Sequence, residues 1–264
     1  MKSIMKASFY QMRREKVIYI APVIILGLSA LTILMAHMGG SVGNGTGVVS
    51  GDEYVANGFG ALLQIQLMMY VVIVGTVCAG DFSDKTSFYE VMSGHRRRDV
   101  FWGRVIPAIM ISMFLSVLIT GTELGLIYML QGWEGRMNFF EVVMRNVLML
   151  FPLCRILCEL ICVAFLVREK WLVIGIGMFI YIISSVLPSF VQDSASVILG
   201  ITNIQLLSDY ESWMTYNVVD GIEMVTVYDS SISFGMAAGT IAASVAAGAF
   251  FLFLGYHFFE KDDM

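Results

Sequence analysis

The apolar residues of this chain fall in long blocks instead of alternating with polar ones. Each block is long enough to cross about 30 Å of hydrocarbon as a helix that rises about 1.5 Å per residue. Lipid offers the backbone no hydrogen-bond partner, so we expect helices, and the blocks are too long and continuous for the short strands of a barrel. The pattern predicts a single all-α transmembrane domain over 1–264 with six spans, at about 17–38, 58–79, 105–130, 139–167, 171–188 and 233–258.

Composition supports a membrane protein. The chain has 264 residues, of which 58% are hydrophobic and 14% charged, whereas soluble domains carry about 25% charged residues. Too few polar residues remain to cover a water-facing globule, which argues against a soluble helical bundle. The net charge of −5 suggests no nucleic-acid partner. All four cysteines lie inside apolar blocks, so no disulfide framework is expected.

Lys and Arg are sorted to one side of the predicted membrane, which sets the orientation. Thirteen of the 16 fall in the N-terminal stretch, the loops after the second and fourth spans, and the tail, whereas Arg136 alone lies on the opposite side. The remaining two, Arg145 and Arg155, lie within the fourth span. This bias predicts cytoplasmic N and C termini in a multi-pass protein of the bacterial cytoplasmic membrane.

The N-terminal stretch has the pattern of a helix lying on the membrane. Within residues 2–16, Ile4, Met5, Phe9 and Met12 share one helical face, and the basic residues lie largely elsewhere. This amphipathic pattern predicts an interfacial helix in contact with lipid. The apolar run that follows is too long for a signal peptide, so we interpret it as a retained span.

Motifs for nucleotide and metal binding are missing. No Gly-Lys dipeptide occurs, which excludes a phosphate-binding P-loop, and no His is followed by Glu, which excludes a His-Glu-x-x-His zinc site. We therefore expect no enzymatic activity and no cofactor or metal in this chain. If ATP drives the protein, another chain binds it.

The loop at 80–104 is the most distinctive cytoplasmic feature. Residues 84–92 predict a short helix with Phe88 and Met92 on one side, followed by a basic run. One interpretation is a solvated loop whose arginines bind anionic lipid headgroups. We favour a docking site for a partner protein, because exposed aromatic residues suit such contacts. The docking residues would be Asp84, Lys85, Thr86, Phe88, Tyr89, Glu90, Met92, Ser93, Arg96 and Arg97.

With its basic amphipathic N-terminal helix, six spans and the run Asp81-Phe82-Ser83-Asp84-Lys85-Thr86 before Arg96–Arg98 and Arg104, the chain resembles permease subunits of type-2 ABC exporters. Lys85 stands where the family usually has Gly. The resemblance implies that 84–93 is the coupling helix, a homodimer of permeases and two copies of an ATPase subunit that binds ATP and Mg. It also implies short outer helices in 189–232 that cap the exit. Small permeases of this kind resemble exporters of bacteriocin-like or phenol-soluble-modulin-like peptides, and drugs, antibiotics or lipids are the alternative substrates.

Charged and polar residues inside the spans need partners or water. Glu123 and Arg145 have matching predicted depths and are expected to pair between neighbouring helices, whereas Arg155 and Glu159 are spaced to pair on one helix. These charges clamp helices together or line a path, and we favour the clamp. Gln64 and Gln66 are further candidates for path lining.

Small residues predict close helix packing in two places. One stripe is Cys154, Cys158 and Cys162 in the fourth span. The other is the last span, where two small faces, Gly235, Gly239, Ala243 and Ala247 beside Ala238, Ala242 and Ala246, predict that the span is buried against its own bundle.

Two other functional classes stay open. An ion-coupled secondary transporter would need no ATPase and would use the embedded charges to bind its ion. An intramembrane enzyme would need a nucleophile, for which Ser29 is a weak candidate without a His at matching depth.

Overall fold

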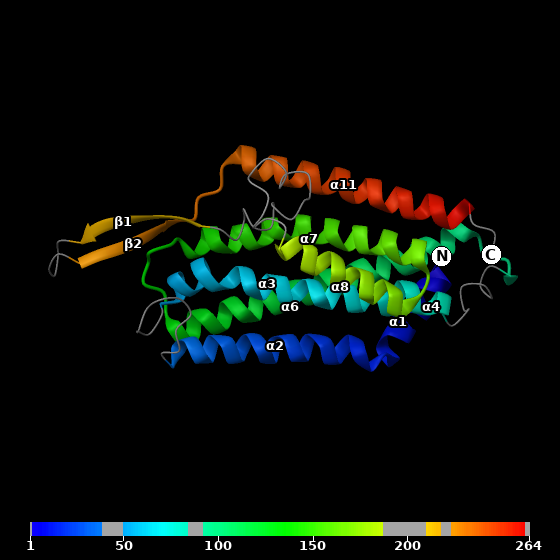
Figure 1. Ribbon diagram of the computed structural model, residues 1–264, viewed down its shortest axis with the longest axis horizontal. Helices are drawn as coiled ribbons and strands as arrows, with labels where there is room; N and C mark the ends of the chain where they lie inside the picture. The colour runs from blue at the N-terminus through cyan, green and yellow to red at the C-terminus, as the bar shows by residue number, and fades with distance from the viewer. Residues whose placement is uncertain (1, 39–49, 84–91, 187–209, 218–222, 262–264) are drawn as a thin grey trace.

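The computed structural model describes residues 2–38, 50–83, 92–186, 210–217 and 223–261. Its long helices run side by side along one axis, with α1 and the end of α11 at one end and a β-hairpin at the other (Figure 1). The elements are α1 Lys2–Arg14, α2 Lys16–His37, α3 Gly51–Val74, a π-helical turn Gly75–Ala79, α4 Gly80–Ser83, α6 Arg97–Gln131, α7 Phe139–Val167, α8 Lys170–Val186, β1 Glu211–Asn217, β2 Glu223–Asp229 and α11 Phe234–Lys261.

Among the described residues, four helices are long and apolar enough to cross a membrane. They are α2, α6, α7 and α11. The other two predicted spans fall on α3 and α8, whose described apolar stretches, Gln66–Ala79 and Lys170–Phe179, are shorter. The protein therefore has the helices of a multi-pass membrane protein.

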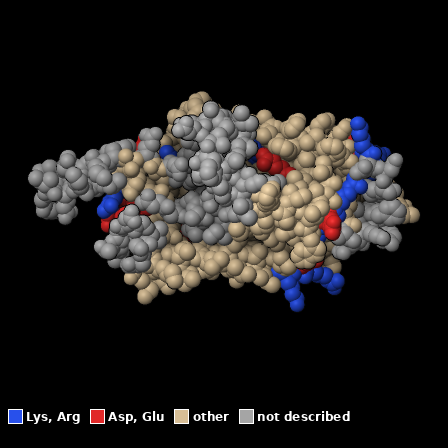
Figure 2. Space-filling model, viewed as in Figure 1, with Lys and Arg blue, Asp and Glu red and all other residues tan. Residues whose placement is uncertain are grey.

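Lys and Arg mark one end of the bundle. Figure 2 shows most of the visible basic side chains at the end that carries α1 and the end of α11. Helix α6 begins at Arg97, earlier than the predicted start at 105, so it extends beyond its apolar block into this basic end. The same end of the bundle therefore carries the surface that the charge bias assigns to the cytoplasm.

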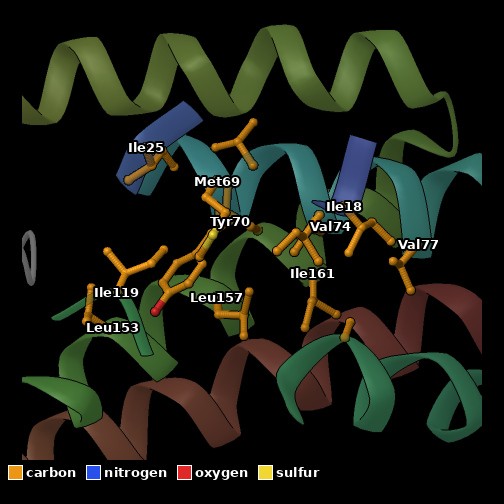
Figure 3. Close-up of a cluster of buried hydrophobic side chains, with 14 of the residues drawn as sticks. Ile18, Ile25, Met69, Tyr70, Val74, Val77, Ile119, Leu153, Leu157 and Ile161 are labelled. Atoms are coloured by element: carbon orange, nitrogen blue, oxygen red, sulfur yellow. The ribbon is translucent and has the colours of Figure 1, made fainter. Parts of the chain in front are cut away.

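The interior of the bundle is an apolar cluster to which α2, α3, α6 and α7 all contribute. Figure 3 shows Ile25, Tyr70, Ile119 and Leu157 among the side chains that meet there. Tyr70, Ile119 and Leu157 are fully buried. These four helices therefore share one core.

Helices α3 and α8 approach closely at two glycines. A Cβ added to Gly75 would lie 2.6 Å from the Ile174 side chain, and one added to Gly177 would lie 2.6 Å from Cγ1 of Val71. Real Cβ atoms do not come this close, so both positions depend on the absence of a side chain.

Helix α1 packs on α6 through its predicted apolar face. Ile4 and Met12 are buried, and a Cβ on Gly103 of α6 would lie 2.7 Å from the Ile4 side chain. Phe9, predicted on the same face, is 40% exposed. Part of the amphipathic face is thus used inside the protein and part remains exposed.

The prediction for the last span is wrong in its choice of face. Gly235 and Gly239 of α11 are exposed, and a Cβ on Gly239 would meet no atom within 4 Å. The buried seam of α11 holds Thr240, Ser244, Gly248, Gly255 and Phe259. Two registers of small residues run along this helix, and spacing alone did not distinguish them.

The cysteine stripe of α7 packs against this seam, as predicted. A Cβ on Gly248 would lie 3.6 Å from Sγ of Cys158, and one on Gly255 would lie 3.2 Å from Cα of Cys162. The backbones of α7 and α11 therefore approach closely where small side chains face one another.

A β-hairpin in the outer segment departs from the all-α prediction. Strands β1 and β2 pair antiparallel, with Glu211 opposite Asp229 and Asn217 opposite Glu223. Short helices were expected in 189–232, of which 189–209 and 218–222 lie outside the described residues. A hairpin satisfies its backbone groups by pairing two strands. It therefore lacks the helical spacing of apolar residues from which the other elements were predicted.

We expect Gly177→Val to destabilise the α3–α8 contact. The added side chain overlaps Val71, and overpacking of this kind lowers the free energy of unfolding by about 1–3 kcal/mol. The measurement is the thermal unfolding midpoint of purified protein in detergent. Gly175→Val is the matched control, because a Cβ at Gly175 meets no atom within 4 Å. Equal midpoints for the two variants would contradict the packing described above.

Candidate functional site

A ladder of polar side chains runs between α2, α3 and α6, inside the apolar bundle. Helix α3 supplies one residue to each rung. The rungs are Tyr54 Oη donating to Thr32 Oγ1 at 3.3 Å, Gln66 Nε2 donating to Thr120 Oγ1 at 3.0 Å, and a hydrogen bond shared by Tyr70 and Ser116. Because these bonds cross helix boundaries, they fix how α3 sits between its neighbours.

Glu123 lies in the same ladder with its charge unmatched. Its side chain is 0% exposed, and Ser29 and Gln66 lie beside the carboxylate. Among the described residues, neither carboxylate oxygen has a hydrogen-bond partner. An unpaired carboxylate in the middle of a membrane costs at least about 2.5–3.5 kcal/mol. The predicted ion pair between Glu123 and Arg145 is not present.

Arg145 instead binds backbone carbonyls beside the hairpin. Its Nε donates to Ser230 O at 3.1 Å, and its Nη2 donates to Ser231 O at 3.0 Å and to Asp229 O at 3.3 Å. Its guanidinium carbon lies 4.6 Å from the centre of the Tyr210 ring. Arg145 is thus a clamp, as favoured from the sequence, but it holds the outer segment to α7 and not α6 to α7.

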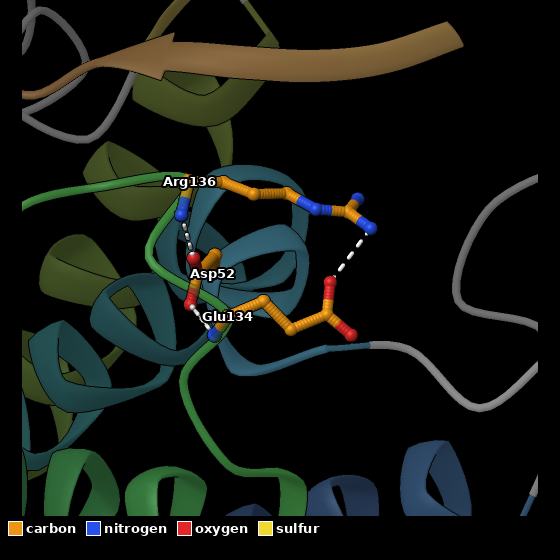
Figure 4. A network of polar contacts seen from close by, with 3 residues as sticks. All are labelled: Asp52, Glu134 and Arg136. Atoms are coloured by element: carbon orange, nitrogen blue, oxygen red, sulfur yellow. Dashed lines mark hydrogen bonds and ion pairs between the residues drawn. The ribbon is translucent and has the colours of Figure 1, made fainter. Parts of the chain in front are cut away.

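A second set of polar contacts joins the loop between α6 and α7 to the start of α3 (Figure 4). The Asp52 carboxylate, in the first turn of α3, accepts from the backbone N–H of Arg136 at 2.6 Å and of Glu134 at 3.3 Å. The side chains of Arg136 and Glu134 form an ion pair at 2.6 Å. Gly51 packs so closely that a Cβ there would lie 2.3 Å from Gly132 O. The loop between α6 and α7 is therefore fixed to the start of α3.

The hairpin is joined to the same loop. Tyr228 N donates to Arg136 O at 3.3 Å, and Ser230 Oγ donates to the Glu141 carboxylate. The Ser231 side chain and backbone N–H hydrogen-bond the Asp229 carboxylate and hold its pKa below the usual value. These contacts tie the outer ends of α3, α6, α7 and the hairpin into one unit.

A cavity of about 180 Å³ lies between α6 and α7, beside the ladder. Thr120, which accepts from Gln66, belongs both to the ladder and to the cavity wall. Asn146 also lines it, and its buried Oδ1 has no hydrogen-bond partner among the described residues. The rest of the lining is almost wholly apolar: Val117, Gly121, Leu124, Val143, Val147, Met149, Leu150 and Leu153.

The predicted pair of Arg155 and Glu159 is confirmed. Arg155 Nε lies 3.1 Å from Glu159 Oε1, one helical turn along α7. Arg155 is nearly buried and Glu159 partly exposed. The charge at this depth is therefore matched within α7.

At the end of the bundle that is rich in Lys and Arg, Phe82 lies between two arginines and an aromatic cluster. The guanidinium carbons of Arg104 and Arg168 lie 5.6 Å and 5.7 Å from its ring centre. Its ring meets Phe165 of α7 and Phe259 of α11 edge-on, with centroids 5.5 Å and 5.9 Å apart. Four helices, α4, α6, α7 and α11, thus meet around the residue that precedes the docking loop; we call this cluster the Phe82 anchor.

Most predicted docking residues lie outside the described part of the chain. These are Asp84, Lys85, Thr86, Phe88, Tyr89 and Glu90. Of those described, Met92 is exposed, Ser93 and Arg96 lie at the surface before α6, and Arg97 Nη1 donates to Glu260 O at 2.7 Å. The side chain of Gln64 is also outside the described residues, and Gln66 faces the ladder and not the cavity.

Sequence reasoning missed most of the ladder. Ser29, Thr120 and the pair Tyr70–Ser116 carried no prediction as structural partners. The available signal was the helical spacing of Ser112, Ser116, Thr120 and Glu123, which places four polar residues along one side of α6.

Comparison with known proteins adds no assignment. The sequence matches no protein-family model, and a search of curated proteins found no significant relative. The chemistry of the site is therefore argued from its own residues.

We expect Arg145→Ala to release the outer segment from α7. It removes the three carbonyl contacts and the ring contact, and hydrogen bonds to charged groups contribute about 1.5–3 kcal/mol each. Amide hydrogen exchange at 227–233 should therefore accelerate, and protein yield should fall. Arg136→Ala, which removes a more exposed ion pair, is the control. Unchanged exchange combined with lost transport would instead assign Arg145 to a transport path.

Proposed function

We propose that this chain is the membrane-spanning permease subunit of an ATP-driven exporter. In this proposal it crosses the bacterial cytoplasmic membrane six times, with α3 and α8 as the two further spans and both termini in the cytoplasm. It acts as a homodimer together with two copies of a separate ATPase subunit. The position of α1 and the end of α11 at the same end of the bundle supports an even number of crossings (Figure 1).

The observation that carries the proposal is the Phe82 anchor. Phe82 stands two residues before the proposed coupling helix and packs against side chains of α6, α7 and α11. Helices α6 and α7 are also the two that line the cavity. A push on the loop by a closing ATPase would therefore be passed to the two helices that line this open-sided cavity.

The cavity supports an apolar or amphipathic substrate. An engineered apolar cavity of about 150 Å³ accommodates benzene, so a cavity of about 180 Å³ accommodates a large apolar side chain or a short acyl segment. Thr120 and Asn146 offer polar atoms at its wall. A membrane-partitioning antimicrobial or toxin peptide is the substrate we propose first, followed by drugs, antibiotics and lipids.

The exposed face of α11 supports a homodimer. Gly235, Gly239 and Ala243 lie on it, and small residues permit close approach between helices in a membrane. In this proposal a second copy covers that face.

A second candidate function is an ion-coupled transporter that needs no ATPase. The unmatched carboxylate of Glu123 is the observation that favours it, because intramembrane carboxylates in transporters bind coupling ions. Transport that persists in proteoliposomes without ATP and ATPase, but follows an ion gradient, would select this alternative.

Two variants separate docking from coupling. Phe88→Glu places a charge at the proposed docking surface, and loss of an aromatic anchor of about 2 kcal/mol or more lowers affinity by at least about thirtyfold. Phe82→Leu leaves that surface intact but removes the ring contacts of the anchor. We expect the first variant to lose co-purification with the proposed ATPase subunit. The second should keep co-purification and lose substrate-stimulated ATP hydrolysis.

His37→Ala, at the exposed end of α2 away from both surfaces, is the control for this pair. Retained ATPase binding by Phe88→Glu would move the docking site elsewhere. Normal stimulated hydrolysis in Phe82→Leu would remove the anchor from the coupling route.

Filling the cavity tests whether it holds substrate. We expect Gly121→Leu to reduce the transport rate by about tenfold or more, because an isobutyl group occupies part of the cavity and lost apolar contacts are worth about 1–3 kcal/mol. The assay is substrate efflux from proteoliposomes that contain the ATPase. Gly125→Leu is matched, since a Cβ meets no atom within 4 Å at either glycine and Gly125 does not line the cavity. Equal transport by the two variants would argue against substrate occupancy.

A further inference from the structure

The polar ladder holds two buried acceptors that lack a donor. Both carboxylate oxygens of Glu123 and Oε1 of Gln66 have no hydrogen-bond partner in the described part of the chain. Gln66 uses its amide nitrogen on Thr120. Ser29, beside the carboxylate, donates its hydroxyl to Ile25 O at 2.6 Å, which leaves its oxygen as a further acceptor. Even with the second N–H of Gln66, the acceptor oxygens around Glu123 outnumber the side-chain donors.

No cationic side chain compensates Glu123. On α7, Arg145 is engaged with the carbonyls of 229–231, and Arg155 with Glu159. Helix α2 carries its ionisable residues near its ends: Lys16, Tyr19 and His37. From α3, Tyr54 is the titratable group near enough to interact electrostatically with Glu123, and Tyr70 shares its hydroxyl with Ser116. Neither tyrosine is a cation, so the negative charge has no protein counter-charge among the described residues.

A metal ion suits this geometry poorly. The described residues contain no group of three His, Cys, Asp or Glu side chains that would hold a metal ion. Helices α2 and α6 are continuous at this depth, so their carbonyls are engaged within the helices and not available as ligands. A proton needs no coordination shell. On Glu123 it turns an acceptor-only group into a donor, and the neighbouring acceptors Gln66 Oε1 and Ser29 Oγ supply a partner.

We infer that Glu123 is a proton-binding site inside the membrane and that its protonation holds α2, α3 and α6 together. The reaction is reversible: the carboxylate takes one proton from water and becomes a neutral acid that donates to the ladder. Release of the proton leaves an uncompensated charge between the three helices and favours their separation, which admits water. The inference stands apart from the exporter proposal, because it concerns the helix bundle alone and needs no ATPase.

Infrared spectroscopy tests the protonation state directly. Full-length protein in lipid nanodiscs should show the carbonyl stretch of a protonated carboxylic acid at neutral pH. Glu123→Gln should lack this band. Glu159→Gln is the matched control and should keep it, because Glu159 has Arg155 as an ion-pair partner 3.1 Å away and Glu123 has none among the described residues. If the folded wild type shows no such band at neutral pH, or if Glu123→Gln keeps it, the inference is overturned.

The pH dependence of stability gives a second, independent readout. The folded state favours the protonated form, so its stabilisation is present at low pH and is lost as pH rises through the titration of Glu123. Wild type should lose thermal stability on this rise, whereas Glu123→Gln, which is neutral at every pH, should not. Glu123→Asp keeps a carboxyl group and serves if the Gln variant does not fold: its acid band should remain, at a shifted frequency. A stabilisation that depends on Na⁺ at fixed pH, and that Glu123→Gln abolishes, would show a metal ion in place of the proton and would refute the inference.

Discussion

The hydrocarbon interior offers no hydrogen-bond partner, and the arrangement of this protein depends on that constraint. Backbone groups are satisfied within helices, so the remaining question is what each polar side chain does. Arg145 donates hydrogen bonds to the carbonyls of residues 229–231. These bonds satisfy both the buried guanidinium and the backbone carbonyls of that segment. The ladder of α3 does the same with hydroxyl and amide groups. Glu123 is the exception, and that is why it stands out as a site.

A second consequence is that apolar side chains alone do not bring helices together in lipid, because lipid tails are equally apolar. Complementary shape must bring the helices together, and the closest contacts occur at glycines, which have no side chain. Gly177 admits Val71 of α3 into the surface of α8, and Gly255 lets α11 reach the backbone of Cys162. Polar bonds across helices then fix the depth at which these surfaces meet. The bundle is specified by glycines and hydrogen bonds together.

The features that the sequence predicted depend on residues close together in the chain. The features that it did not predict depend on contacts between distant segments. The block at 139–167 coincides with α7, and the pair Arg155–Glu159 is present, since both depend on local spacing along one helix. The pairing of Glu123 with Arg145 was wrong because matching depth does not tell which way two helices face. The contact between the hairpin segment and Arg145 was also missed. Its acceptors are backbone carbonyls, which every residue type carries, so the sequence does not reveal them. The docking segment 84–91 lies outside the described residues, and the exporter role stays a proposal.

Helix α6 is the element through which the two ends of the molecule communicate. It is one continuous helix of 35 residues, or about 50 Å. Near its N-terminal start it carries Arg104, which contacts Phe82 in the anchor; further along, Thr120 reaches both the ladder and the cavity. Pro107 lies between these two regions and removes one helical hydrogen bond, so a shift at the anchor would change the bend of α6 as well as the position of Glu123 relative to Ser29 and Gln66. Movement of α6 would then alter the environment of the proton, and loss of the proton would loosen α6. If the proposed exporter function holds, the protein would be controlled both at the Phe82 anchor and at Glu123, and neither control requires a residue that binds nucleotide.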